Sequence, residues 1–261
     1  MATQTAVKFQ RLAMRIEAPI AHIVLSNPPL NVIDIVMMEE LAAALKEVEA
    51  HPEVVAVIFS GAGKSFSAGV DVAAHTTDKV HPMLTKFHDV IRAVVGSKKV
   101  TIAEVRGNCL GGGAELSMVC DLVYTTDDAK WGFPEISLGC FPPVAVTALS
   151  ALVGQKRASD LMLTGRTISG AEAAEMGLAN QAAAADELES VIEEKVRALS
   201  GLSAAALAIT KKANYAWDSM HFEKGLARAE KIYLDELMNT EDANEGIRAF
   251  IEKRRPQWKG R

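Results

Sequence analysis

The sequence predicts an α/β fold with mostly parallel strands, because apolar runs typical of buried strands alternate with helical segments. Three such runs occupy residues 54–59, 100–105 and 122–125, and runs of this kind are typical of strands covered on both faces. The order along the chain is strand, helix, strand, loop, helix, strand, helix, strand. This alternation favours parallel pairing within one sheet.

The first elements are an exposed strand over residues 7–16, a second strand near Ala21–Leu25 and a turn at residues 27–29. Asp34 has the position of an N-cap for the helix that follows. Apolar residues then recur every three or four positions, which indicates one buried helical face. These residues are Ile35, Met38, Leu41, Leu45 and Val48. His51 and Pro52 end this helix.

The chain from about Ser169 onward is predicted to be helical almost throughout. Ser169 and Glu172 have the spacing of a capping box at a helix start. Further helices are expected over residues 189–199, 204–212, 222–238 and 242–253. No linker-like stretch separates this tail from the rest, so we expect it to pack on the core or on a neighbouring subunit.

The composition is that of a soluble globular protein and excludes several classes of function. The 261 residues are 49% apolar and 23% charged, with a net charge of −5, which argues against nucleic-acid binding through phosphate neutralisation. No apolar run reaches the length of about 18 residues that a membrane span needs. The histidines and the three cysteines lack metal-ligand spacing, so we expect no metal, and we expect buried thiols in a reducing cytoplasm.

Two glutamates twenty residues apart are the strongest chemical signal. Glu115 lies in the segment GGGAEL at residues 111–116, and Glu135 lies in WGFPEI at residues 131–136. A carboxylate pair suits general acid–base chemistry, because one group takes a proton while the other gives one. Glu135 sits in an uncharged stretch, which favours a raised pKa. Glu115 lies in an apolar helix, so its carboxylate is either exposed or in a pocket.

Two small-residue loops accompany the glutamates. Gly111–Gly113 precede a helix, and the segment FSAGVD at residues 66–71 follows a buried strand. Such loops present backbone N–H groups that bind an oxyanion, and the ends of parallel strands are where α/β sheets bind ligands. There is no GxGxxG pattern and no Walker lysine, which disfavours nucleotide binding. Glutamates and loops together predict water addition to, or a proton shift in, a substrate that becomes an enolate.

The motifs FSAGVD, GGGAEL and GFPEISLG, in this order and spacing, resemble those of the crotonase (enoyl-CoA hydratase/isomerase) superfamily. The resemblance covers nearly the whole chain. It implies a spiral of ββα units over residues 1–200 and a helical trimerisation region over residues 201–261, in a trimer or a hexamer. It also implies that an acyl-CoA thioester is the substrate and that no cofactor is required.

By this resemblance, the N–H groups of Val70 and Gly112 form the oxyanion hole, and Glu115 and Glu135 flank the catalytic water. The retention of both acids favours a hydratase over an isomerase. The substrate- and CoA-binding positions that the family implies are Lys64, Ser67, Ala68, Gly69, Val70, Asp71, Gly111, Trp131, Phe141, Pro143, Phe250 and Lys253. Lys253 often serves a neighbouring subunit in the family, although here it also belongs to a basic chain end at residues 253–255.

One departure from the family pattern concerns the loop after Glu135. Pro143 replaces a glycine whose N–H usually orients water, and proline has no N–H to donate. A phenylalanine and a proline after the Leu-Gly pair resemble the cyclohexa-1,5-diene-1-carbonyl-CoA hydratases, as do residues 31–34 and the chain end. Rigid apolar side chains around Glu135 are also expected to favour a planar ring. These side chains are Trp131, Phe133, Phe141 and Pro142.

Three alternatives compete with this interpretation. The first is a general short-chain enoyl-CoA hydratase or isomerase of fatty-acid β-oxidation with an unusual loop. The second is a CoA-binding or scaffold protein that has lost its chemistry, which the retention of both glutamates and both glycine loops disfavours. The third is a nucleic-acid-binding relative, which lacks the basic helix that it would need.

Overall fold

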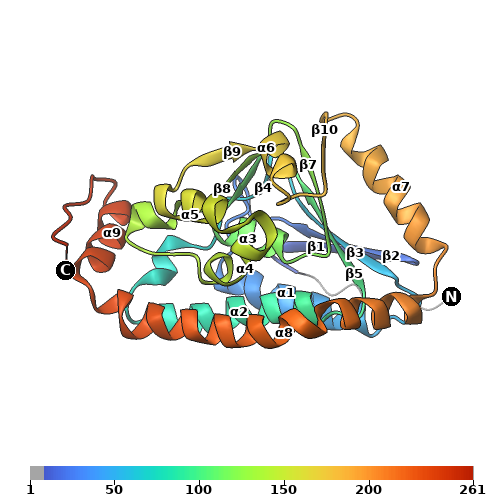
Figure 1. Cartoon of the computed structure of the whole chain (residues 1–261), viewed down its shortest axis with the longest axis horizontal. Coiled ribbons are helices and arrows are strands. Elements are labelled where there is room, and N and C mark those ends of the chain that lie inside the picture. The colour runs from blue at the N-terminus through green and yellow to red at the C-terminus, as the bar shows by residue number, and fades with distance from the viewer. Residues whose placement is uncertain (1–8, 261) are drawn as a thin grey trace.

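The computed structural model describes residues 9–260, apart from the side chains of residues 216–220. Two sheets lie side by side, with helices around them (Figure 1). The larger sheet has the strand order β1-β2-β3-β5-β7-β10, and the smaller sheet has the order β4-β6-β8-β9. The α/β fold class that the sequence predicts is therefore confirmed.

The larger sheet contains the strands that the apolar runs predict. Its members are β1 (Leu12–Glu17), β2 (Ile20–Leu25), β3 (Ala56–Gly61), β5 (Val100–Val105), β7 (Leu122–Thr126) and β10 (Gln181–Ala183). β1 pairs antiparallel with β2, and every other pair in this sheet is parallel. The predicted first strand over residues 7–16 begins at Leu12 in the structure, and residues 7 and 8 lie outside the described part of the chain.

The smaller sheet explains how the chain winds. Its members are β4 (Ser65–Ser67), β6 (Asn108–Leu110), β8 (Lys130–Gly132) and β9 (Thr167–Ser169). β4, β6 and β8 follow β3, β5 and β7 along the chain, so each turn contributes one strand to each sheet before a helix. This is the ββα spiral that the family resemblance implies. Strands of three residues are too short to show alternation in the sequence.

Two of the helices begin at the caps that the sequence places, Asp34 and Ser169. The α-helices are α1 (Ile35–Glu49), α2 (Val80–Gly96), α3 (Gly112–Met118), α4 (Pro143–Val153), α5 (Gln155–Thr164), α6 (Gly170–Glu175), α7 (Leu188–Ser200), α8 (Ala204–Asp235) and α9 (Glu241–Ile251). Asp34 Oδ1 accepts the Met37 N–H at 2.8 Å at the start of α1. Ser169 Oγ accepts the Glu172 N–H at 3.1 Å at the start of α6, which confirms this half of the predicted capping box.

Two predictions for the C-terminal part were wrong. Residues 204–212 and 222–238 do not form separate helices, because α8 runs without a break from Ala204 to Asp235. The residues between them include neither glycine nor proline, so nothing stops the helix there. The region is also not wholly helical, since β10 adds a parallel strand beside β7. Its alanine-rich sequence, Gln181–Ala183, favours a helix in isolation, and the sheet edge overrides that preference.

The C-terminal helices contribute to the same hydrophobic core as the sheets. α8 passes along the side of the molecule that carries α1 and α2 (Figure 1). Leu226 and Tyr233 of α8 and Ile247 of α9 are buried in one cluster with Phe59 and Phe87. In the described part of the chain, no helix has the length and apolar character needed to cross a membrane.

Candidate active site

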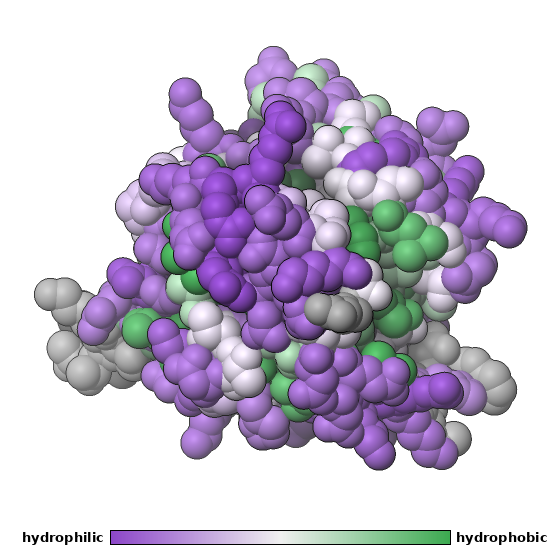
Figure 2. Space-filling model, turned by 90° about the vertical axis from the view of Figure 1, so that its left-hand side faces the viewer, coloured by the Kyte–Doolittle hydropathy of each residue, from purple (hydrophilic) through white to green (hydrophobic). Residues whose placement is uncertain are grey.

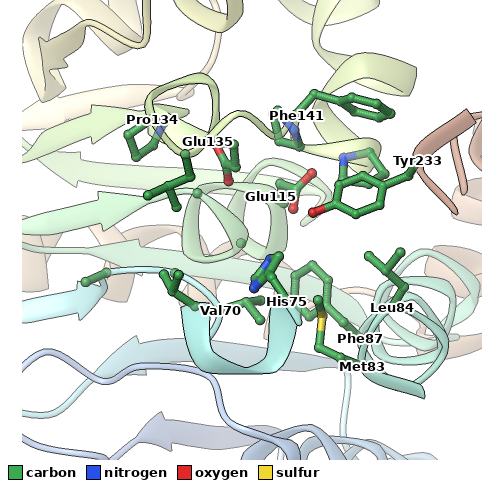
Figure 3. A pocket seen from close by; sticks show the side chains of 18 of the residues that line it. Val70, His75, Met83, Leu84, Phe87, Glu115, Pro134, Glu135, Phe141 and Tyr233 are labelled. Carbon is green, nitrogen blue, oxygen red and sulfur yellow. The ribbon is translucent and has the colours of Figure 1, made fainter. Parts of the chain in front are cut away.

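A cavity of about 230 Å³ lies between the loop after β4, the helices α2 and α8, and the starts of α3 and α4. Eleven of the residues that the sequence analysis selects line it, although they come from distant parts of the chain. They are Ala68, Gly69, Val70, Gly111, Gly112, Glu115, Glu135, Phe141, Pro142, Pro143 and Phe250. The spiral therefore brings both glutamates and both glycine loops to one place (Figure 3).

Six of the selected residues do not line this cavity. Ser67 is fully buried, and its hydroxyl donates to the Asn31 carbonyl and accepts the Gly69 N–H, so it shapes the loop. Trp131 is also fully buried and donates from Nε1 to Thr125 Oγ1 at 3.0 Å. Phe133 is likewise buried away from the cavity, so the expectation that Trp131 and Phe133 line it was wrong. The remaining three are Lys64, Asp71 and Lys253.

Several lining residues were not selected from the sequence. They come from the helix after the first loop, from α2 and from α8, and they include Val72, His75, Met83, Leu84, Phe87, His88 and Tyr233. In the sequence these residues belong to ordinary apolar helical faces. In a helix, apolar residues that border a cavity have the same spacing as apolar residues that pack on a core. The sequence pattern therefore could not identify these residues as part of a site.

Glu115 is held in place by two backbone N–H groups at the start of α4. Its side chain is only 3% exposed, and Oε1 accepts the N–H groups of Val144 and Ala145 at 2.8 and 3.0 Å. Burial raises the pKa of Glu115, whereas these two N–H groups favour the ionised form. The positive end of a helix adds to that preference. The sequence left open whether this side chain is exposed or lies in a pocket. In the structure, Glu115 lies in a pocket.

Glu135 faces Glu115 from the short helix that follows β8 (Figure 3). Gly111, with φ near 50°, leaves the space that the Glu135 carboxylate fills, because a Cβ on Gly111 would lie 2.6 Å from Oε1. Glu135 Oε2 is buried with no hydrogen-bond partner in the described residues. Burial first, and then the nearby charge of Glu115, raise the pKa of Glu135. The pair is therefore best described as sharing one proton, carried by Glu135.

Pro143 fits this arrangement without its own N–H. It is the first residue of α4, a position where a missing N–H costs nothing because a helix leaves its first N–H groups unpaired. The next two N–H groups are those that Glu115 accepts. The start of α4 thus binds the carboxyl group of Glu115. The carboxyl groups of Glu115 and Glu135 remain as the polar groups that face the space between them.

The two glycine loops are in close contact beside the glutamates. A Cβ placed on Gly112 would lie 3.3 Å from the Val70 nitrogen, and one placed on Gly69 would lie 3.5 Å from the Gly112 nitrogen. Among the described residues, neither the Val70 N–H nor the Gly112 N–H donates to a protein acceptor. Two free donors this close together suit one oxygen that gains negative charge.

The buried Glu135 predicts a pH-dependent loss of stability. The folded chain keeps its proton up to about pH 8, whereas the unfolded chain releases it near 4.5. Stability from this group is complete below the unfolded pKa and is lost as the pH rises, at up to about 1.4 kcal/mol per pH unit. We expect a Glu135→Gln variant to gain unfolding free energy over the parent chain from pH 5 to pH 8. Denaturant titrations at each pH measure the unfolding free energy of both proteins. If the two curves of unfolding free energy against pH run parallel, the prediction is wrong.

A spiral α/β fold with a buried acid–base pair beside two free N–H groups defines an enzyme that stabilises an enolate while it moves protons. The sequence pattern described as enoyl-CoA hydratase/isomerase matches residues 15–261. The chain belongs to that family. Its relatives carry the names of enoyl-CoA hydratases, which are hydro-lyases, and it is an enzyme of this type.

Individual relatives cover almost the whole chain. A cyclohexa-1,5-dienecarbonyl-CoA hydratase of Thauera aromatica is 36% identical over 91% of this chain and 92% of its own. A probable enoyl-CoA hydratase of Rhizobium meliloti is 35% identical over 98% and 100%. Among solved structures, an enoyl-CoA hydratase/isomerase of Xanthobacter autotrophicus matches with a TM-score of 0.85 and 31% identity, over 94% of this chain and 97% of that one.

Proposed function

We propose that this enzyme adds water to the double bond of an α,β-unsaturated acyl-CoA, and that its preferred substrate is cyclohexa-1,5-diene-1-carbonyl-CoA in the degradation of aromatic compounds. The observation that carries the hydratase chemistry is the pair of facing carboxylates beside two unpaired backbone N–H groups. The cyclic substrate is supported by the Thauera aromatica relative and by the rigid lining of the cavity.

In the proposed mechanism, the thioester oxygen accepts the N–H groups of Val70 and Gly112. The Glu115 carboxylate takes a proton from water as the water oxygen attacks the β-carbon, and the electron pair of the double bond moves toward the thioester oxygen. Glu135 then gives its proton to the α-carbon, and the enolate returns to a thioester. The fixed donors favour the state with most charge on oxygen, which is the general source of such rate enhancement.

The size and lining of the cavity favour a compact ring. An apolar cavity of about 150 Å³ is enough to hold benzene, so about 230 Å³ accommodates a six-membered ring with its carbonyl group. Phe87, Phe141, Pro142 and Pro143 supply flat or rigid walls. A flexible alkyl chain loses more rotamer freedom in such a space than a ring does.

We expect kcat/KM for cyclohexa-1,5-diene-1-carbonyl-CoA to exceed that for crotonyl-CoA by at least about a hundredfold, on the order of 3 kcal/mol in the barrier. Purified protein is assayed against both thioesters, with loss of the conjugated double bond followed by absorbance. Equal or better activity on crotonyl-CoA would favour a general short-chain enoyl-CoA hydratase, which the names of several relatives support as the alternative. Absence of hydration with every enoyl-CoA would contradict the hydratase proposal itself.

We further propose that the enzyme is a trimer or hexamer assembled through its C-terminal helices. Large apolar side chains remain exposed on that part of the single chain, including Ile209 at 69%, Phe250 at 55% and Trp258 at 48%. Figure 2 shows hydrophobic areas between hydrophilic ones on the end of the molecule that carries α9. Exposed apolar groups of this kind are typical of subunit interfaces. Light scattering is expected to give three or six chains, and a stable, active monomer would contradict the proposal.

A further inference from the structure

The short helix that carries Glu135, Pro134–Leu138, has little support of its own. It has five residues, none of them is fully buried, and no side chain of the described residues caps its start. The Glu135 carboxyl group nevertheless occupies a tight slot, because a Cβ on Gly111 would lie 2.6 Å from its Oε1 atom. The position of this carboxyl group therefore depends on the elements that pack against the short helix from outside.

The C-terminal helix α9 is one of these elements, and its backbone contacts the end of the short helix. A Cβ placed on Gly246 of α9 would lie 2.5 Å from the carbonyl carbon of Leu138 and closer still to the carbonyl oxygen. From the other side, a Cβ on Gly139 would lie 2.9 Å from the Asp242 carbonyl oxygen. No side chain fits at either position unless one backbone moves away from the other, so the two glycines permit this close approach.

The contact reaches Glu135 through the backbone of its own turn. Leu138 and Gly139 follow Glu135 by three and four residues, and the Cys140 N–H donates to the Glu135 carbonyl oxygen at 3.0 Å. This hydrogen bond closes the turn around the residues that α9 contacts. A displacement of Leu138 and Gly139 therefore moves the residue that carries the catalytic carboxyl group.

The same helix is connected to the loop that supplies the other half of the site. The Thr77 hydroxyl donates to Asn244 Oδ1 of α9 at 3.1 Å, while Asn244 Nδ2 donates to the Thr240 carbonyl oxygen at 3.0 Å. Thr77 lies two residues after the short helix Val72–His75, which begins just after Val70. α9 thus contacts both the loop of the oxyanion donor Val70 and the helix of the proton donor Glu135.

We propose that α9 is the element that positions Glu135 relative to Glu115 and the oxyanion donors, and that Gly246 is the positioning residue in this contact. The inference rests on the proposed function, because it takes Glu135 as the group that gives its proton to the substrate. Gly246 acts through Glu135 and has no contact with the reacting atoms. A displacement of about 1 Å at a catalytic group can cost about a hundredfold in rate, so a contact without room for one methyl group bears directly on turnover.

Gly246→Ala tests the contact while it favours the helix itself. Alanine has a higher helix propensity than glycine, so α9 is expected to form, but the added methyl group separates it from Leu138. Glu135 then gains contact with water or moves away from Glu115. Either change is expected to lower the pKa of Glu135, which burial and the charge of Glu115 raise to about 8.

Other titratable groups do not obscure this change. Besides Glu115, the described groups that interact with the Glu135 charge are Cys140 and Tyr233. Burial raises the pKa of the Cys140 thiol to about 11 and that of Tyr233 well above its usual value. Both groups therefore stay protonated in the range where Glu135 titrates.

The pH dependence of kcat and kcat/KM for hydration separates a shifted Glu135 from a general loss of structure. The parent enzyme is expected to lose activity near pH 8, as Glu135 gives up its proton. In Gly246→Ala, we expect kcat at neutral pH to fall at least about tenfold and this alkaline limb to move to lower pH by at least about one unit. Gly139→Ala, which opens the same contact from the other side, should give the same two changes.

Two further variants serve as controls. Gly201→Ala, at the end of α7, should change neither quantity, because a Cβ there lies no closer than 3.7 Å to the Ala198 carbonyl oxygen. Phe250→Ala removes the α9 side chain that lines the cavity but leaves the contact with Leu138. It should weaken the binding of a saturated acyl-CoA in calorimetry without a shift of the alkaline limb.

A folded Gly246→Ala enzyme with parental kcat and an unmoved alkaline limb would overturn the proposal. Weaker acyl-CoA binding with an unmoved limb would do so too, because α9 would then act only as part of the cavity wall, as Phe250→Ala does. If Gly246→Ala fails to fold, the same outcomes for Gly139→Ala decide. Absence of hydration by the parent protein with every enoyl-CoA is a separate result, which contradicts the proposed function instead.

Discussion

A Glu135→Gln variant is expected to lose about two to four orders of magnitude in kcat, the range for a lost acid–base group. Glutamine keeps the shape that Gly111 accommodates but has no acidic proton for the α-carbon. Because the amide has nearly the size and shape of the carboxyl, affinity for a saturated acyl-CoA should stay close to that of the parent enzyme. Steady-state kinetics and calorimetry on the same preparation measure both quantities.

Glu115→Gln is expected to lower kcat over the same range for a different reason. Its amide oxygen still accepts the N–H groups of Val144 and Ala145, so the start of α4 stays capped. The amide cannot take a proton from water. The pair then no longer has two carboxyl groups between which a proton can be shared. Glu193→Gln, an exposed substitution on α7, serves as the control and should leave kcat unchanged. Near-normal turnover by either active-site variant would remove that residue from the proposed mechanism.

The sequence predicted the elements whose signal is local. Asp34 caps α1 and Ser169 caps α6 because a cap is specified by the side chain that makes it and by the residues immediately after it. The buried strands β3, β5 and β7 were predicted because strands covered on both faces are apolar over most of their length. β4, β6 and β8 were missed, since three residues cannot display a period.

The candidate site was predictable only in part, because its remaining members depend on tertiary contacts. The glutamates and glycines stand out in the sequence as unusual residues in their surroundings. The environment of Glu115 does not stand out in the sequence, because the N–H groups that hold its carboxyl group come from Val144 and Ala145 in another element. His88 and Tyr233 are 145 positions apart, and only the packing of α8 along α2 makes them one wall. Trp131 shows the opposite error, since closeness to Glu135 in sequence did not place it in the cavity.

Replacing Gly112 tests the oxyanion hole more directly than any other change. Gly112→Pro removes the N–H itself, and loss of one such donor typically costs about 3–4 kcal/mol of transition-state stabilisation. Gly112→Ala keeps the N–H but places a Cβ 3.3 Å from the Val70 nitrogen and 2.6 Å from the Val70 Cγ2 atom. The methyl group therefore occupies the space in front of both donors.

Both Gly112 variants are expected to lower kcat/KM by at least about a hundredfold, because the charge on the thioester oxygen loses one donor or both. Gly96→Ala, at the end of α2, is the matched control, since a Cβ there meets nothing within 4 Å. Circular dichroism and calorimetry with a saturated acyl-CoA separate a folded, ligand-binding but inactive protein from a misfolded one. A folded Gly112→Ala enzyme with parental kcat/KM would show that the thioester oxygen does not lie between Val70 and Gly112, and the enolate would then need another source of stabilisation.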